Sequence, residues 1–328
     1  MKASQTLHPQ LFEKPEKKAT RDGFGEALLE LGQKNDRVVA LTADLGESVR
    51  TGAFEKAFPK RFFEVGITEQ FMIGAAAGMA LEGKIPFATT FANFGSGRVY
   101  DFIRQSVCYN QTNVKIAVTH AGITLGEDGA THQMLEDLGM MRTLPHMTVV
   151  CPCDYLETKK AVWAIAEHVG PSYLRMGRAS VPLITTESTP FKMGQANVLR
   201  EGTDVSIAAC GVMVYPALMA ALDLQKSYQI SAEVVNHHSL KPFDVKTLIT
   251  SAKTCGALVT AEEHQRTSGL RAACAEVLTE KYPVPIQYVA VEDTFGESGT
   301  PDALLQKYGL TKENVVKKAL AAVKAKRA

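Results

Sequence analysis

The sequence predicts an α/β protein made of two tandem domains, each with a parallel sheet. Short apolar runs alternate with longer amphipathic stretches along the chain, as they do in parallel sheets covered by helices on both faces. The chain has 328 residues, which is enough for two domains. Its composition changes at residues 181–193 (VPLITTESTPFKM), between two similar series of strands and helices.

The first series follows a polar, proline-interrupted stretch at residues 1–18, which we expect to lie on a surface or on a partner. The helical spacing of Phe24, Ala27, Leu28 and Leu31 predicts the first helix. The apolar runs that follow predict buried strands at 37–42, 62–65, 85–90, 114–120, 147–152 and 172–176, with helices at 69–81, 99–109 and 155–169.

The second series repeats this alternation. Its strands are predicted at 204–210, 231–237, 257–263 and 285–291, with helices at 215–226, 244–252 and 269–281. The domain organisation is therefore an N-terminal extension at 1–18, a first domain at 19–185, a linker at 186–192 and a second domain at 193–328. No short repeat or low-complexity segment is found.

Composition and charge indicate an ordinary soluble protein. The net charge is +1, which gives no reason to expect binding to nucleic acid or to a membrane surface. No apolar run has membrane-spanning length, and the N-terminus lacks the apolar core of a secretion signal. The six cysteines are scattered without a paired framework, which favours a reducing, cytoplasmic location.

The stretch from Glu64 to Gly97 is the first candidate site. It places one acid, Glu69, at the head of a helix in which Gln70 is the only other polar residue, so we expect this helix to be covered. The small side chains of Gly74 and Gly78 predict that another backbone approaches it closely. Glu69 is either a helix N-terminal acid that interacts with the dipole or a partly buried proton donor aimed at a ligand. The following FANF segment favours the donor, because Phe91 and Phe94 could flank a flat ring.

The loop Thr119–Gln133 (THAGITLGEDGATHQ) is the second candidate site. It follows a predicted strand and places His120, Asp128 and His132 where loops often carry function. Asp44 also follows a strand, at the edge where parallel sheets bind ligands. Ordinary turns share this composition, and a metal site is disfavoured because a glycine-rich loop does not hold ligands in a fixed helical register.

The segment GITEQ at the head of the Glu69 helix, together with FANF and GEDGATHQ, resembles the pyrimidine-binding domain of thiamine diphosphate enzymes of the transketolase family. The resemblance implies that Glu69 protonates the aminopyrimidine ring of the cofactor, whose imino form then removes the thiazolium C2 proton. It also implies that Asp44, Phe91 and Phe94 contact the cofactor. The similarity extends from about Ala19 to about Val316, and segments such as VEDTFGESGTPDALLQKYGL are similar to the family's C-terminal domain.

The same resemblance implies a site for a phosphorylated sugar. His120 would contact cofactor and substrate, Asp128 would hydrogen-bond a sugar-phosphate hydroxyl, and His132 would bind the phosphate end. Three further matches, Arg21, Ser48 and Arg178, would complete a phosphate clamp of charge-assisted bonds. The family's third pocket aromatic, expected near Gly97, is absent. Arg175 has no matched role.

The chain lacks a GDG motif followed by an asparagine, which in the family binds the diphosphate and Mg²⁺. The resemblance therefore implies a split transketolase that transfers a two-carbon ketol unit, in which a partner subunit supplies the diphosphate-binding domain and the metal ligands. Self-association through the pyrimidine domain would give an α2β2 assembly.

Pentose phosphates are the default substrates, and an unusual ketose phosphate would use the same groups. Three alternatives are the β subunit of a 2-oxo acid dehydrogenase, a 1-deoxyxylulose-5-phosphate synthase-like enzyme and a non-catalytic scaffold subunit. The first does not need the GEDGATHQ loop or Arg178, the second normally carries both halves in one chain, and the third would be expected to lose the acid or the clamp.

Overall fold

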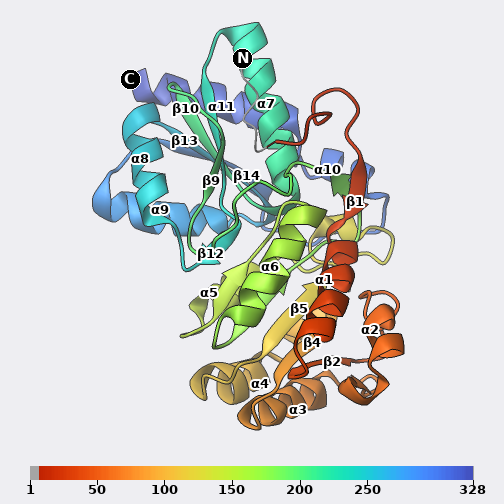
Figure 1. Ribbon diagram of the computed structural model, residues 1–328. Helices are drawn as coiled ribbons and strands as arrows, with labels where there is room; N and C mark the ends of the chain where they lie inside the picture. The colour runs from red at the N-terminus through yellow and green to blue at the C-terminus, as the bar shows by residue number, and fades with distance from the viewer. Residues whose placement is uncertain (1–6, 328) are drawn as a thin grey trace.

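The computed structural model describes residues 7–327, which form two α/β units in tandem (Figure 1). A seven-stranded sheet forms the centre of the first unit, in the order β12-β6-β7-β5-β4-β2-β3. Its strands are β2 (Val38–Thr42), β3 (Phe62–Glu64), β4 (Ile85–Phe91), β5 (Lys115–Thr119), β6 (Thr148–Val150), β7 (Ser172–Arg175) and β12 (Ser239–Lys241). All neighbouring pairs are parallel except β12 with β6, so the expected parallel sheet has an antiparallel edge.

Helices cover both faces of this sheet, because successive strand residues point to opposite sides. Val38 and Ala40 of β2 pack with one set of helices, whereas Val39 and Leu41 pack with the other. The first set is α1 (Thr20–Lys34), α2 (Gly52–Ala57) and α6 (Tyr155–Glu167), and α1 and α6 lie side by side in Figure 1. The second set is α3 (Glu69–Leu81), α4 (Tyr100–Phe102) and α5 (Asp137–Thr143).

The helix predicted at 99–109 is present at residues 100–109, but it is not a regular α-helix. Instead, two π-helical turns, Asn93–Gly97 and Ile103–Tyr109, enclose the short helix α4. Gly95 lies so close to the sheet that a Cβ there would approach Val118 to 2.6 Å. Single π-turns inside helices frequently occur at functional sites. The first of these two turns, Asn93–Gly97, contains Phe94.

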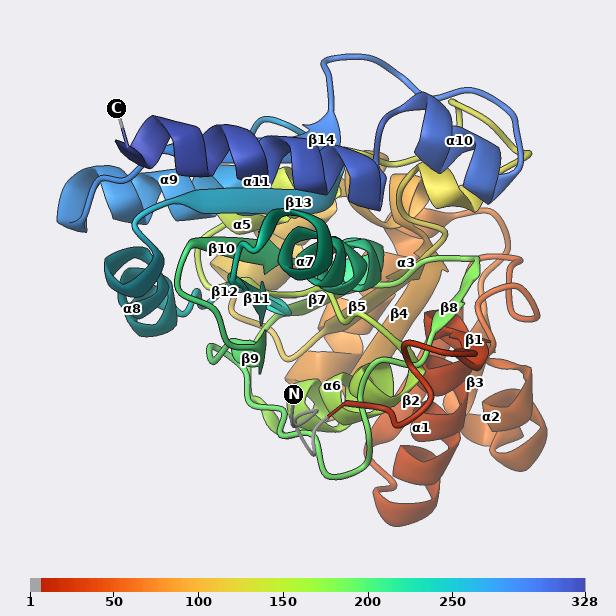
Figure 2. The same cartoon turned by 90° about the horizontal axis from the view of Figure 1, so that it is seen from above.

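The second unit has a five-stranded sheet in the order β14-β13-β10-β11-β9, in which only β9 is antiparallel to its neighbour. Its strands are β9 (Asn197–Arg200), β10 (Val205–Ala209), β11 (Ala232–Asn236), β13 (Leu258–Gln265) and β14 (Ile286–Val291). The helices are α7 (Val214–Tyr228), α8 (Val245–Cys255), α9 (Leu270–Lys281), α10 (Pro301–Lys307) and α11 (Lys312–Arg327). Helices α7 and α11 cover one face, and α8 and α9 cover the other (Figure 2).

The two units are joined by more than the linker. Strand β12 leaves the second unit to complete the first sheet, and one apolar core runs from α3 through both units to α9. At the N-terminus, β1 (Lys17–Ala19) pairs with β8 (Ser180–Pro182), while Leu7 and Leu11 are buried against the second unit. The described part of the N-terminal stretch therefore lies on the surface of the chain itself and is anchored by these two leucines, and residues 1–6 lie outside the described residues.

The six cysteines are buried and unpaired. Within the described chain, no helix combines the length and apolar character needed to span a bilayer.

Candidate active site

Predicted site residues gather at the carboxyl edge of the first sheet. Asp44, His120 and Arg178 follow the ends of β2, β5 and β7, and Phe91 is the last residue of β4. These four strands are parallel neighbours in the order β7-β5-β4-β2, so their carboxyl ends meet at one edge. Ligands of open α/β sheets bind at this edge.

Glu69 is the first residue of α3 and is only 2% exposed. The Nη1 atom of Arg98 donates to both of its carboxylate oxygens, each at 3.0 Å. A buried carboxylate needs such a partner, because removing a charge from water is costly. No sequence pattern indicated Arg98, which lies 29 residues away next to the π-helical turn.

The aromatic rings form a layered wall rather than two sides of a slot. The rings of Phe91 and Phe94 are parallel within 14°, with centroids 6.1 Å apart. A third ring does not fit between them, since stacking on both sides needs about 7 Å. The other neighbour of Phe91 is His120, with centroids 3.7 Å apart. The guanidinium carbon of Arg98 lies 4.3 Å from the centre of the Phe94 ring.

His120 is held in one orientation and is neutral. Its Nδ1 lies 2.7 Å from the Thr119 hydroxyl, and its Nε2 faces Nη1 of Arg21 at 3.5 Å. An arginine can only donate, so we assign Nε2 as the acceptor and Nδ1 as the protonated nitrogen. Burial, reinforced by the charges of Arg21, Arg178 and Arg50, lowers the pKa of His120 to about 3.

A cluster of arginines surrounds this histidine. The pKa of Arg21 is lowered by burial and by the neighbouring charges of Arg50 and Arg178. Arg21 donates to the carbonyl oxygen of Ser48 at 2.9 Å, whereas no partner is found for the Ser48 hydroxyl among the described residues. Arg50, which no sequence motif singled out, is held by Asp22 at 2.7 Å. Several cations held close together create a site for an anion.

The loop Thr119–Gln133 brings its own polar groups to this edge. Arg178 Nη1 donates to Glu127 at 2.5 Å and to the Leu125 carbonyl at 2.8 Å. Asp128 is exposed, and the described residues offer its carboxylate no hydrogen bond. His132 contacts the Thr131 hydroxyl at 2.9 Å and the edge of the Phe94 ring.

The two candidate segments of the sequence meet in space. Asn93, in the FANF segment, donates to the Thr131 carbonyl at 2.7 Å. Asp44 belongs to an acidic hollow of about 390 Å³ that Glu47, Glu55 and Glu64 also line. Glu64 accepts from the Asp44 amide at 2.7 Å and so fixes the turn after β2, a role that was not predicted from the sequence.

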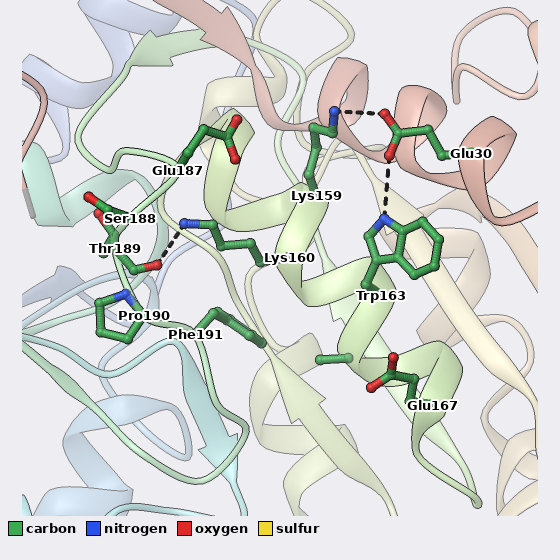
Figure 3. A pocket seen from close by; sticks show the side chains of 11 residues that line it. Glu30, Lys159, Lys160, Trp163, Glu167, Glu187, Ser188, Thr189, Pro190 and Phe191 are labelled. Carbon is green, nitrogen blue, oxygen red and sulfur yellow. Dashed lines mark hydrogen bonds and ion pairs between the residues drawn. The ribbon is translucent and has the colours of Figure 1, made fainter.

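Another hollow, of about 590 Å³, lies between α6 and residues 187–191 (Figure 3). Its cations are already paired: Lys159 contacts Glu30 at 2.9 Å, and Lys160 donates to the Thr189 carbonyl at 2.7 Å. This hollow shares no residue with the cluster at the sheet edge. We take that cluster as the candidate active site, because the predicted site residues gather there.

The fold and the site define a class of two-unit α/β proteins with a ligand site at the carboxyl edge of the first sheet. Comparison with known proteins identifies the family within this class. The family model for the transketolase pyrimidine binding domain matches residues 16–183, and that for the transketolase C-terminal domain matches residues 194–315. The chain belongs to the transketolase family, and its two units are the pyrimidine-binding and C-terminal domains of that family.

Individual relatives cover almost the whole chain. A 6-deoxy-6-sulfo-D-fructose transketolase subunit of Clostridium sp. is 44% identical over 299 residues, 91% of this chain and 92% of its own length. An apulose-4-phosphate transketolase subunit of Phocaeicola vulgatus is 39% identical over 307 residues, 93% of this chain and 98% of its own. A solved structure described as a split gene transketolase, inactive beta4 tetramer, is 51% identical with a TM-score of 0.89 and covers 94% of this chain and 99% of its own.

The family membership and the fold class expected from the sequence are thereby confirmed. Thiamine diphosphate use and a transferase role follow at the level of the family.

Proposed function

We propose that this chain is the pyrimidine-binding subunit of a split transketolase. With thiamine diphosphate and Mg²⁺ it transfers a two-carbon ketol unit between phosphorylated sugars, and it is active only with a diphosphate-binding partner subunit. The observation that carries this proposal is the placing of a buried carboxylate, Glu69, and a cluster of arginines along one sheet edge. The cofactor, when bound, supplies the nucleophilic carbon, and the protein orients it.

The residues at the site fit the aminopyrimidine ring of the cofactor. Phe94 offers a flat aromatic face beside Glu69, and a planar cation, Arg98, already lies on that face while bonding Glu69. The aminopyrimidine ring is planar like the Arg98 guanidinium, and it would likewise stack on Phe94 and bond to Glu69. In this proposal Glu69 holds the proton, Phe91 and His120 support the wall behind Phe94, and Asp44 contacts the cofactor from the end of β2.

The cation cluster supports a phosphorylated substrate. Arg21 and Arg178 can donate to the oxygens of a phosphate dianion, with Ser48 and His132 beside them, while the neutral His120 offers Nε2 as an acceptor for a substrate hydroxyl. Arg50 extends this set. Asp128, exposed and without a bond in the described chain, is available to a sugar hydroxyl. This arrangement favours a sugar phosphate over a 2-oxo acid. Because two relatives are named for 6-deoxy-6-sulfo-D-fructose and apulose 4-phosphate, the substrates to be tested should include unusual ketoses.

The surface of α3 supports self-association. Phe71 and Leu81 of α3 are 63% and 72% exposed, and Ile67, just before the helix, is 71% exposed, so the expected cover of this helix does not come from the chain itself. Nothing lies within 4 Å of a Cβ built on Gly74 or Gly78, which leaves room for a second backbone. Helix α4 with exposed Phe102 continues the surface, as Figure 1 shows at the foot of the molecule. Burying such a patch against a symmetric copy would remove apolar area from water.

A partner is required in this proposal because the chain has no motif for the diphosphate and its metal. The relatives named above are themselves called subunits. Pairing of two such chains, flanked by two partners, gives an α2β2 assembly. The buried, unpaired cysteines support a reducing, cytoplasmic location.

The test is an assay of ketol transfer by the purified chain, alone and combined with a diphosphate-binding subunit, against a panel of sugar phosphates. We expect turnover and tight cofactor binding to appear together on addition of the partner. Robust transfer by the highly purified single chain would refute the split-enzyme proposal. Activity with 2-oxo acids and none with sugar phosphates would favour the dehydrogenase alternative instead.

A further inference from the structure

Arg98 occupies an unusual position at the candidate active site. Its Nη1 atom donates to both oxygens of the buried Glu69 at 3.0 Å, and its guanidinium carbon lies over the face of Phe94, 4.3 Å from the ring centre. It follows Gly97, near which the third pocket aromatic of the family was expected. Arg98 therefore stands where the expected wall of the pocket is incomplete.

The two contacts of Arg98 are those that the proposed cofactor ring would make. A planar cation stacked on an aromatic face and bonded to a carboxylate imitates a protonated aminopyrimidine. We infer that Arg98 acts as a stand-in for that ring in the cofactor-free chain. It holds Glu69 in place and has to move away before the cofactor ring can bind. This inference rests on the proposed function of the site.

The surroundings of Arg98 allow it to leave. Its side chain is 40% exposed, in contrast to Glu69 at 2%. Only Nη1 makes a hydrogen bond to a described residue, so Nε and Nη2 hold nothing else in place. A long side chain with one anchoring nitrogen can swing into solvent, whereas the carboxylate on α3 stays with the helix.

The stand-in also has a physical purpose. Without a cation beside it, a carboxylate buried to this degree would be left uncompensated in the empty site. Arg98 removes that cost until a ligand arrives, and the ligand must then displace it. The cofactor-free protein is stabilised, and ring binding is weakened by the contacts that are lost. Partner binding, which adds the diphosphate contacts in the proposed assembly, would shift this competition toward the cofactor.

The experiment measures binding of the ring by itself. The probe is 4-amino-5-hydroxymethyl-2-methylpyrimidine, which lacks the diphosphate and so needs no partner, titrated into the full chain by calorimetry. Arg98→Met should bind it about tenfold more tightly than the wild type, because one hydrogen bond to a charged group no longer competes. Arg98→Lys should fall between them. Arg104→Met, which removes an exposed arginine of the same segment, is the matched control and should bind as the wild type does.

The same variants in the assembled complex separate this inference from the proposed function. Suppose that the wild-type complex transfers ketol units but Arg98→Met binds the ring no more tightly than the wild type. This result would overturn the role of Arg98 and leave the proposed function intact. Failure of the wild-type complex to bind thiamine diphosphate at all would overturn both. If Arg98→Met does not fold, a crystal structure of the wild-type complex decides: an Arg98–Glu69 contact that persists at about 3 Å beside the bound ring refutes the inference, and a broken contact supports it.

Discussion

Substitution of Arg178 tests whether the cation cluster recognises phosphate. In the absence of substrate, Arg178 Nη1 bonds the exposed Glu127 and the Leu125 carbonyl. A hydrogen bond from arginine to a phosphate oxygen is worth roughly 1.5–3 kcal/mol, or about 10- to 150-fold in affinity. Part of that is offset, because Arg178 must first leave the Leu125 carbonyl. We therefore expect Arg178→Ala to raise KM for phosphorylated acceptors about tenfold, near the lower end of this range.

The assay compares KM for a phosphorylated acceptor with that for the same sugar without its phosphate, in the assembled enzyme. His132→Ala should show the same selectivity. Glu127→Gln is the matched control, because it frees Arg178 from an exposed ion pair and should improve phosphorylated acceptors by a few-fold at most. Equal penalties for both acceptors in Arg178→Ala would show that this residue serves the fold or the cofactor, and the reasoning from the cluster would be refuted.

Three further predictions concern Glu69, α3 and acid stability. Glu69→Ala should lower the rate of thiamine diphosphate C2 hydrogen exchange at least about a hundredfold, whereas Glu82→Ala on the exposed end of α3 should not; a wild-type exchange rate in Glu69→Ala would contradict the assignment. Gly78→Leu should leave the chain folded but reduce its self-association in sedimentation velocity, since nothing lies within 4 Å of a Cβ there; an unchanged assembly would contradict the α3 interface. Burial, which outweighs the nearby charge of Asp244, lowers the pKa of His238 to about 4. The unfolded chain, with a histidine pKa of about 6.5, therefore binds more protons between these values, so stability should fall as pH drops below 6.5, by up to roughly 1.4 kcal/mol per pH unit for this group. Urea unfolding midpoints at pH 7.5, 6 and 5 should show this loss of stability. In His238→Gln the dependence of stability on pH should be weaker than in the wild type, and the same dependence in both proteins would contradict the prediction.

The parts of the site that depend on strand ends were predictable from the sequence. Asp44, Phe91, His120 and Arg178 could be brought to one edge because apolar runs locate parallel strands, and parallel strands share their carboxyl ends. Backbone details at the same edge were not predictable. Asp44, Arg50 and His120 adopt positive φ angles of 58°, 68° and 59°, a region that non-glycine residues rarely occupy unless their surroundings require it.

The contacts of Glu69 show why the rest could not be predicted. Its helix start was evident from the apolar stretch that follows, but its partner Arg98 depends on π-helical turns rather than on side-chain periodicity. The first of those turns packs Gly95 closely on Val118 and Thr90, a tertiary contact that has no local signal. The crossing of β12 into the first sheet was missed for the same reason, because a three-residue strand at a sheet edge has too few residues to show a pattern.

The C-terminal domain has a larger role in the site than its lack of catalytic candidates suggests. Arg175 of β7, which had no role assigned from the sequence, is buried and bonds Asp137 at 2.9 Å and the Glu263 carbonyl of β13 at 3.0 Å. The Glu263 carboxyl, whose pKa is raised by burial, accepts from the Thr124 amide at 2.7 Å inside the loop Thr119–Gln133.

The other end of that loop is fixed in the same way. Gln133 donates to the Glu297 carbonyl at 2.9 Å, and a Cβ on Gly129 would approach the Ser298 hydroxyl to 2.5 Å. The part of the loop that carries Asp128 and His132 is thus held against the second unit, while His120, at the start of the loop, is anchored on the first. If the proposed phosphate clamp is formed by residues of both segments, its geometry depends on how the two domains are joined, and the buried bonds of Arg175 and Glu263 help to set that geometry.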